Sequence, residues 1–194
     1  MHELDYSNLE RSLIDVIKEE QAKLGYYRED IRLYYPLSSL NHFLGTDVNA
    51  DKMQKILEGT GENVDATRNI VAGMNARLSD KLGMVEVSHR GDRFCFHILP
   101  EGVEYVHENT KENEFIRELV NLVAKHGCTI DQIYELFTAH SDRVGREKMD
   151  NGEFDERIWF QDDADDPYYY CFKQEGGHMI YHRFLPEDYE DFEF

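Results

Sequence analysis

The segment LGMVEVSHRGDRFCFHILPEGVEYV, residues 82–106, determines the architecture expected for the first half of the chain. Apolar and polar residues alternate over 84–88 and again over 93–98, with His89-Arg90-Gly91-Asp92 between the two runs. Alternation with a period of two is typical of strands with one buried face, and two such runs joined by a short Gly-containing turn predict a β-hairpin. The Pro-Glu-Gly that follows predicts a short helical segment up to residue 106.

Upstream of the hairpin the pattern is helical. A first helix is predicted from a capping-box sequence, Ser7-Asn8-Leu9-Glu10, to Gly25, because its apolar residues recur at helical spacing. Shorter helices are predicted over 38–44 and 49–58, and a longer one over 66–82.

The second half starts again at Thr110. One helix is predicted up to Gly127, and Thr129 caps a second helix with Gln132 at the capping-box position. Residues 141–152 contain few apolar side chains and receive no assignment. Three strand-like runs follow and predict a three-stranded antiparallel meander, at 154–160, 168–173 and 178–184.

The order of helices, hairpin and final short helix resembles a winged-helix domain. The resemblance is carried by residues 82–87, by the wing tip Arg90-Gly91-Asp92 and by 99–106, whereas an extra segment at 49–63 departs from that pattern. We therefore expect an α+β protein: a winged-helix-like unit at 1–109, and a helical pair with an acidic antiparallel sheet at 110–194. A Leu-Pro-Glu that follows a strand in each half leaves open that the second unit is a divergent repeat of the first.

DNA binding is the alternative function that this resemblance implies. In DNA-binding winged-helix proteins the recognition helix and the wing contact the nucleic acid. The matching positions here are Arg68, Asn69, Arg77, Lys81, Arg90 and Arg93. The whole chain nevertheless carries a formal net charge of −19, and such a field disfavours a phosphate backbone. A transcriptional regulator is therefore the alternative, and nucleic acid is not the expected partner.

The last 46 residues, 149–194, are acidic and aromatic at the same time, with 14 Asp and Glu against three Lys and Arg. Disordered acidic tails lack aromatic residues, so this segment is expected to fold and to present a negative surface that favours a basic protein partner. Tyr and Trp are common interface anchors, although the same rings also fit a core. The predicted contact set is Trp159, Asp162, Asp163, Asp165, Asp166, Tyr168, Tyr170 and Tyr181.

The sequence shows no motif of catalysis, metal binding or cofactor binding. It contains no nucleophile elbow, phosphate-cradling loop, kinase signature or dinucleotide fingerprint. The cysteines, Cys95, Cys128 and Cys171, form no C-x-x-C pair and are expected to be buried and reduced. We expect a noncatalytic interaction or regulatory protein without metal or cofactor. An enzyme with an unrecognised carboxylate site is the third possibility.

A cytoplasmic location is predicted, because no apolar run approaches the ~20 residues of a membrane span and residues 1–5 lack a signal-peptide pattern.

The chain also resembles an uncharacterised family of small acidic proteins from Gram-positive gut bacteria. This resemblance rests on residues 31–43, 85–104 and 168–191. It implies a bacterial origin and no activity, and the sequence predicts no oligomeric state.

Overall fold

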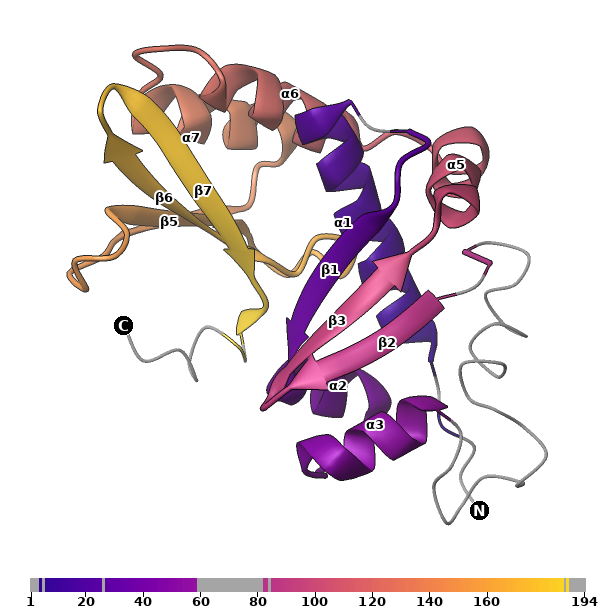
Figure 1. Ribbon diagram of the computed structural model, residues 1–194. Helices are drawn as coiled ribbons and strands as arrows, with labels where there is room; N and C mark the ends of the chain where they lie inside the picture. The colour runs from indigo at the N-terminus through magenta and orange to yellow at the C-terminus, as the bar shows by residue number, and fades with distance from the viewer. Residues whose placement is uncertain are drawn as a thin grey trace. The chain divides into compact units, whose positions relative to one another are not determined.

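The computed structural model describes residues 4, 6–25, 27–58, 82–83, 85–186 and 188. The chain divides into two compact units, residues 1–112 and 113–194; the sequence pattern places the boundary between 109 and 110. Both units combine helices with an antiparallel sheet (Figure 1), so the expected α+β class is confirmed.

The first unit is built around a three-stranded sheet. Its elements are α1 (Ser7–Leu24), β1 (Ile31–Pro36), α2 (Leu37–Leu44), α3 (Ala50–Glu58), β2 (Val85–Arg90), β3 (Arg93–Ile98) and α5 (Pro100–Asn109). The hairpin and the helices predicted over 7–24, 38–44, 49–58 and 100–106 are confirmed. The capping box at Ser7 is wrong, because Tyr6 occupies the N-cap position of α1. The helix predicted over 66–82 lies outside the described residues, apart from Leu82.

Strand β1 is the element of this unit that the sequence pattern misses. The sheet order is β1-β3-β2, and β1 pairs antiparallel with β3 from Ile31 opposite Ile98 to Pro36 opposite Arg93. Buried and exposed residues alternate along β1, with Ile31, Leu33 and Tyr35 in the core. The run is short and ends in a proline that opens the next helix, so it does not look like a strand. Pro36 is tolerated here because β1 is an edge strand.

The second unit consists of two helices and a four-stranded sheet. Its elements are α6 (Glu114–Val123), α7 (Ile130–His140), β4 (Val144–Lys148), β5 (Glu156–Phe160), β6 (Tyr169–Glu175) and β7 (His178–Phe184). The two helices and the Thr129–Gln132 capping box are confirmed, although α6 ends at Val123 rather than at Gly127. The prediction of three strands is wrong, because the order is β4-β5-β6-β7. Val144-Gly145-Arg146-Glu147-Lys148 lacks the apolar alternation of a strand, and it forms one at an edge where charged side chains reach water.

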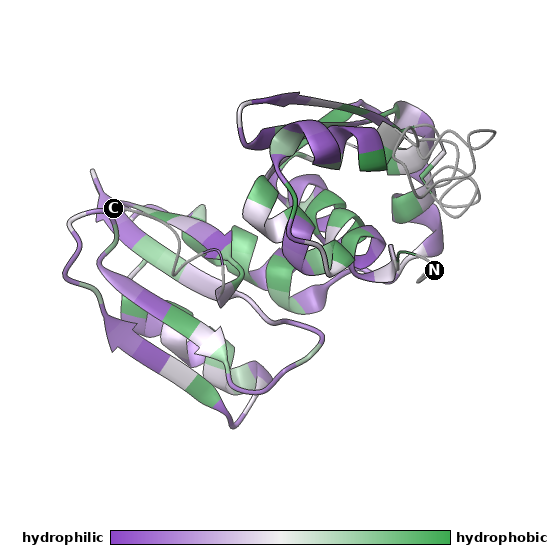
Figure 2. Ribbon diagram, turned by 90° about the horizontal axis from the view of Figure 1, so that it is seen from below, coloured by the Kyte–Doolittle hydropathy of each residue, from purple (hydrophilic) through white to green (hydrophobic). Residues whose placement is uncertain are grey.

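Aromatic rings fill the space between the helices and this sheet. The ring of Phe137 on α7 lies 4.7 Å from Phe115 on α6, 4.8 Å from Phe160 and 5.2 Å from Tyr170, measured between centroids. Because side chains alternate along a strand, neighbouring positions lie on the side away from the helices. We call the helix-covered side the inner face and the opposite side the outer face. Figure 2 shows the resulting interleaving of apolar and polar residues along the strands.

In each unit a strand precedes a Leu-Pro sequence, but this strand has a different position in the two sheets. β3, which precedes Leu99 and Pro100, is the central strand of its sheet, whereas β7, which precedes Leu185 and Pro186, is an edge strand. A divergent repeat stays a prediction.

Candidate functional site

Three outer-face side chains of the second unit form a compact group that we call the aromatic cluster: Arg157 and Trp159 on β5, and Tyr169 on β6. The Trp159 and Tyr169 rings meet edge to face, with centroids 5.4 Å apart. The guanidinium carbon of Arg157 lies 5.3 Å from the Trp159 centroid and 4.6 Å from the Tyr169 centroid, within cation–π range. Nε of Arg157 donates to Glu147 on β4 at 2.8 Å, so this hydrogen bond joins the cluster to β4.

Gly145 on β4 provides the space for the Trp159 ring. The two residues are directly opposite in the β4–β5 register, and a Cβ added at Gly145 would overlap the indole. A glycine within a strand often marks such a close approach. The indole therefore lies against the backbone of β4.

The acidic loop, Asp162, Asp163, Asp165 and Asp166, connects β5 to β6 directly beyond the aromatic cluster. Asp162, Asp163 and Asp165 are exposed, and Asp166 is half-buried. Oδ1 of Asp163 accepts hydrogen bonds from the backbone amides of Asp165, at 2.9 Å, and Asp166, at 3.4 Å. These bonds form an Asx-type turn that fixes the loop. Asp162 also forms an ion pair with Arg143.

Two of the tyrosines predicted to contact a partner are core residues instead. Tyr170 is fully buried and Tyr181 is 8% exposed, because the strand alternation directs both rings to the inner face, where they stack at 6.3 Å. Their assignment to a contact surface is therefore wrong. Tyr170 also supports the loop, since its hydroxyl donates to Oδ2 of Asp166 at 2.7 Å. Tyr168 is half-buried beneath the guanidinium of Arg183, at 4.5 Å.

The structure brings together Trp159 and the acidic loop, and it adds three residues that the sequence reasoning missed: Arg157, Tyr169 and Gly145. The signal for Tyr169 was ambiguous, because three consecutive tyrosines fit either face. Only the β5–β6 register, with Ile158 opposite Tyr170, decides which ring points outward.

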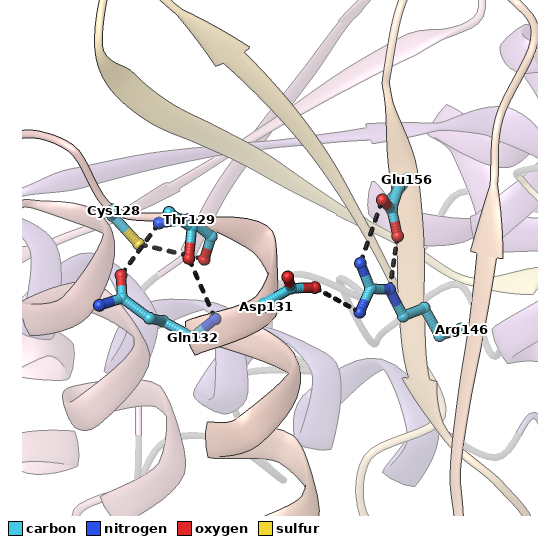
Figure 3. A network of polar contacts seen from close by, with 6 residues as sticks. All are labelled: Cys128, Thr129, Asp131, Gln132, Arg146 and Glu156. Carbon is cyan, nitrogen blue, oxygen red and sulfur yellow. Dashed lines mark hydrogen bonds and ion pairs between the residues drawn. The ribbon is translucent and has the colours of Figure 1, made fainter.

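An ion cluster connects β4, β5 and α7 (Figure 3). Arg146 donates from Nε to Glu156 at 2.6 Å, from Nη2 to the other oxygen of Glu156 at 3.2 Å, and from Nη1 to Asp131 at 2.8 Å. Hydrogen bonding to Glu156, and then to Asp131, raises the pKa of Arg146 above its ordinary value. Glu156 is buried, so this bidentate pair fastens the edge strand to the sheet.

A second polar cluster lies on the exposed side of the first unit's sheet. His97 on β3 contacts Glu86 on β2 through Nδ1 at 2.9 Å, and Asp30, just before β1, through Nε2 at 2.6 Å. Hydrogen bonds to Glu86 and Asp30 raise the pKa of His97, and the bond to His97 lowers the pKa of Asp30. In the part of the chain that the structure describes, no three His, Cys, Asp or Glu side chains are grouped to hold a metal ion.

Of the residues assigned to DNA contact, Arg90 and Arg93 flank the turn of the β2–β3 hairpin. The guanidinium of Arg93 lies 4.7 Å from the centroid of Tyr34, an exposed ring on β1 that the sequence reasoning did not single out. The remaining four, Arg68, Asn69, Arg77 and Lys81, lie outside the described residues.

The three cysteines are free thiols. Cys128 and Cys171 are buried as expected, whereas Cys95 is half-exposed. Burial raises the pKa of the Cys171 thiol to about 12, so this thiol stays protonated at neutral pH and unreactive.

None of the described helices combines the length and the apolar character needed to cross a bilayer.

The chain was compared with known proteins. No curated protein and no solved structure matches it. Residues 6–193 match the family described as "Domain of unknown function, E. rectale Gene description (DUF3877)", which agrees with the resemblance to an uncharacterised family of gut bacteria. Because this match covers nearly the whole sequence, the chain belongs to the DUF3877 family.

Proposed function

We propose that this protein binds a basic partner protein through the acidic loop and the aromatic cluster, and that it catalyses no reaction. The observation that carries the proposal is the position of three exposed carboxylates, Asp162, Asp163 and Asp165, on a hydrogen-bonded loop between the strands that bear Trp159 and Tyr169. Preorganised charges beside aromatic anchors are the combination that protein interfaces use for orientation and affinity.

Arg157 supports a basic partner rather than an apolar one. Its guanidinium already stacks on Trp159 and Tyr169 while it pairs with Glu147, so these rings accept a cation when a carboxylate is close. An incoming Arg or Lys would find the same two kinds of group, ring and carboxylate, in the cluster and its loop. The net charge of −19 would steer such a partner towards the protein.

The test is the association rate of an arginine-rich peptide across a salt titration. Reversing the loop charges with Asp162→Lys, Asp163→Lys and Asp165→Lys should slow association and flatten its dependence on salt. The matched control reverses three acids outside the loop, Asp51→Lys, Glu101→Lys and Glu108→Lys, which alters the net charge equally. Equal losses in both variants would show that net charge alone attracts the peptide and would reject the loop as a binding site.

A cytoplasmic location belongs to the same proposal. The structure's free cysteines, Cys95, Cys128 and Cys171, suit a reducing compartment, in which disulfides are rare.

A winged-helix regulator that binds DNA is the second candidate. It is supported by the helices that precede a β2–β3 hairpin in a sheet of order β1-β3-β2, and by Arg90 and Arg93 at that hairpin's turn. Arg90→Glu with Arg93→Glu should then abolish a salt-sensitive complex with duplex DNA. Absence of any complex between the unaltered protein and DNA at low salt would reject this candidate.

A further inference from the structure

The two edges of the second unit's sheet differ in their protection against strand pairing. β4 carries Arg146, Glu147 and Lys148 in succession, which is how natural proteins prevent an edge from recruiting another strand. β7 forms the opposite edge and pairs with β6 along its whole length, from His178 opposite Glu175 to Phe184 opposite Tyr169. Its residues 178–182, His-Met-Ile-Tyr-His, contain no Asp, Glu, Lys or Arg.

Ile180 lies at the middle of this uncharged edge. Its side chain is 43% exposed, and among the described residues of the second unit it is the one large apolar side chain that is exposed to this degree. The neighbouring Met179 and Tyr181 are buried on the inner face. A stretch of edge without charged residues, with an exposed apolar side chain at its centre, is an arrangement that pairs with a further strand.

We propose that β7 pairs antiparallel with β7 of a second copy of this chain, which would join the four strands of each copy into one continuous sheet. The sequence of β7 is complementary to itself in the register that places Ile180 opposite Ile180. Met179 then lies opposite Tyr181 on the inner face, and His178 lies opposite His182 on the outer face. This register places no like charges opposite each other when the histidines are neutral.

The residues of the edge, rather than the net charge of the chain, favour a second copy over the basic partner proposed above. Residues 178–182 offer no carboxylate to attract a cation, so this edge has nothing that would select a basic segment. The neutral, alternating strand that the edge requires is present in the protein itself. The twofold axis of such a pair is perpendicular to the sheet, so both outer faces, each with its Trp159, would lie on the same side.

The molar mass of the full chain in solution tests this pairing, measured by light scattering over a range of concentrations. The unaltered protein should reach twice its 22.9 kDa chain mass as concentration rises. Ile180→Lys should remain at the mass of one chain at every concentration, because it places two ammonium groups opposite each other in the pair. The matched control is Tyr34→Lys, which also places a Lys at an exposed position of an edge strand, here β1. This variant should still dimerise.

Cross-linking provides a second readout that does not depend on the folding of Ile180→Lys. In the proposed register, the cysteines of Ile180→Cys face each other across the twofold axis, so mild oxidation should form a disulfide-linked dimer. Glu108→Cys, at an exposed position on α5, should form none. A monomeric unaltered protein at all concentrations, a dimer that persists in a folded Ile180→Lys, or equal cross-linking of both cysteine variants would each overturn the proposal.

Discussion

The indole of Trp159 lies against the backbone of Gly145, in the space that any larger residue at position 145 would occupy with its Cβ. This contact joins the charged edge strand β4 to the aromatic cluster. It also explains the glycine at position 145, since only a residue without a side chain leaves room for the ring against the neighbouring strand.

Gly145→Ala should therefore displace Trp159 and lower the free energy of unfolding by about 1–3 kcal/mol, the usual cost of overpacking a close contact. Urea titration measures this loss. Trp159 is the only tryptophan in the chain, so a shift in its emission should accompany it. In a Trp159→Leu background the same substitution should cost much less. An equal cost in both backgrounds would place the strain elsewhere.

The two carboxylates around Arg146 should contribute unequally to stability. Glu156→Gln should lower the free energy of unfolding by about 1–3 kcal/mol, because it weakens a hydrogen-bonded ion pair whose carboxylate side chain is only 10% exposed. Asp131→Asn should cost about 0–1 kcal/mol, because the Asp131 side chain is 78% exposed and its ion pair is screened by water. Urea titration of the two variants compares them directly. A larger loss for Asp131→Asn would contradict this ranking.

The His97 cluster should make the stability of the first unit depend on pH. The raised pKa of His97 stabilises the fold below the group's ordinary value of 6.5, and this contribution is lost as pH rises through the raised value. The lowered pKa of Asp30 stabilises the fold above its ordinary value of 3.8 and is lost as pH falls through the lowered value. The cluster therefore acts most strongly between these two ordinary values.

Raising the pH from about 6 to about 8.5 should lower the melting temperature of the unaltered protein by about 2 °C more than that of His97→Gln. Thermal unfolding at several pH values measures the difference. His42→Gln, at an exposed position on α2, controls for the general titration of histidines and should retain the dependence of the unaltered protein. The same pH dependence in His97→Gln and in the unaltered protein would remove the cluster from the explanation.

Local patterns predicted the elements that carry strong periodicity or chemical stop signals. The hairpin at 85–98 follows from alternation around Gly91, and α7 follows from the Thr129–Gln132 box. β1 and β4 escaped prediction for separate reasons: β1 is a short run that ends at Pro36, and β4 is mostly charged. Their strand conformation comes from pairing with β3 and β5, which are remote in sequence.

The candidate site was predicted in its charge but not in its aromatic part. The exposed carboxylates of the loop follow directly from composition, because a run of Asp stays in water. The choice between Tyr169 and Tyr170 depends on the register of β6 against β5, and a shift by one residue exchanges the two faces. Arg157 could not be identified without that register, since its ring contacts come from Trp159 beside it and Tyr169 on the next strand.

The emission of Trp159 during titration with an arginine-rich peptide tests the proposed function most directly, because the only tryptophan lies within the proposed site. We expect a saturable change at low salt. This change should weaken as salt is added, persist in the Asp51, Glu101 and Glu108 charge-reversal control, and disappear when Asp162, Asp163 and Asp165 are replaced by Lys. No saturable change at low salt, or an undiminished change in the loop variant, would contradict binding at this surface.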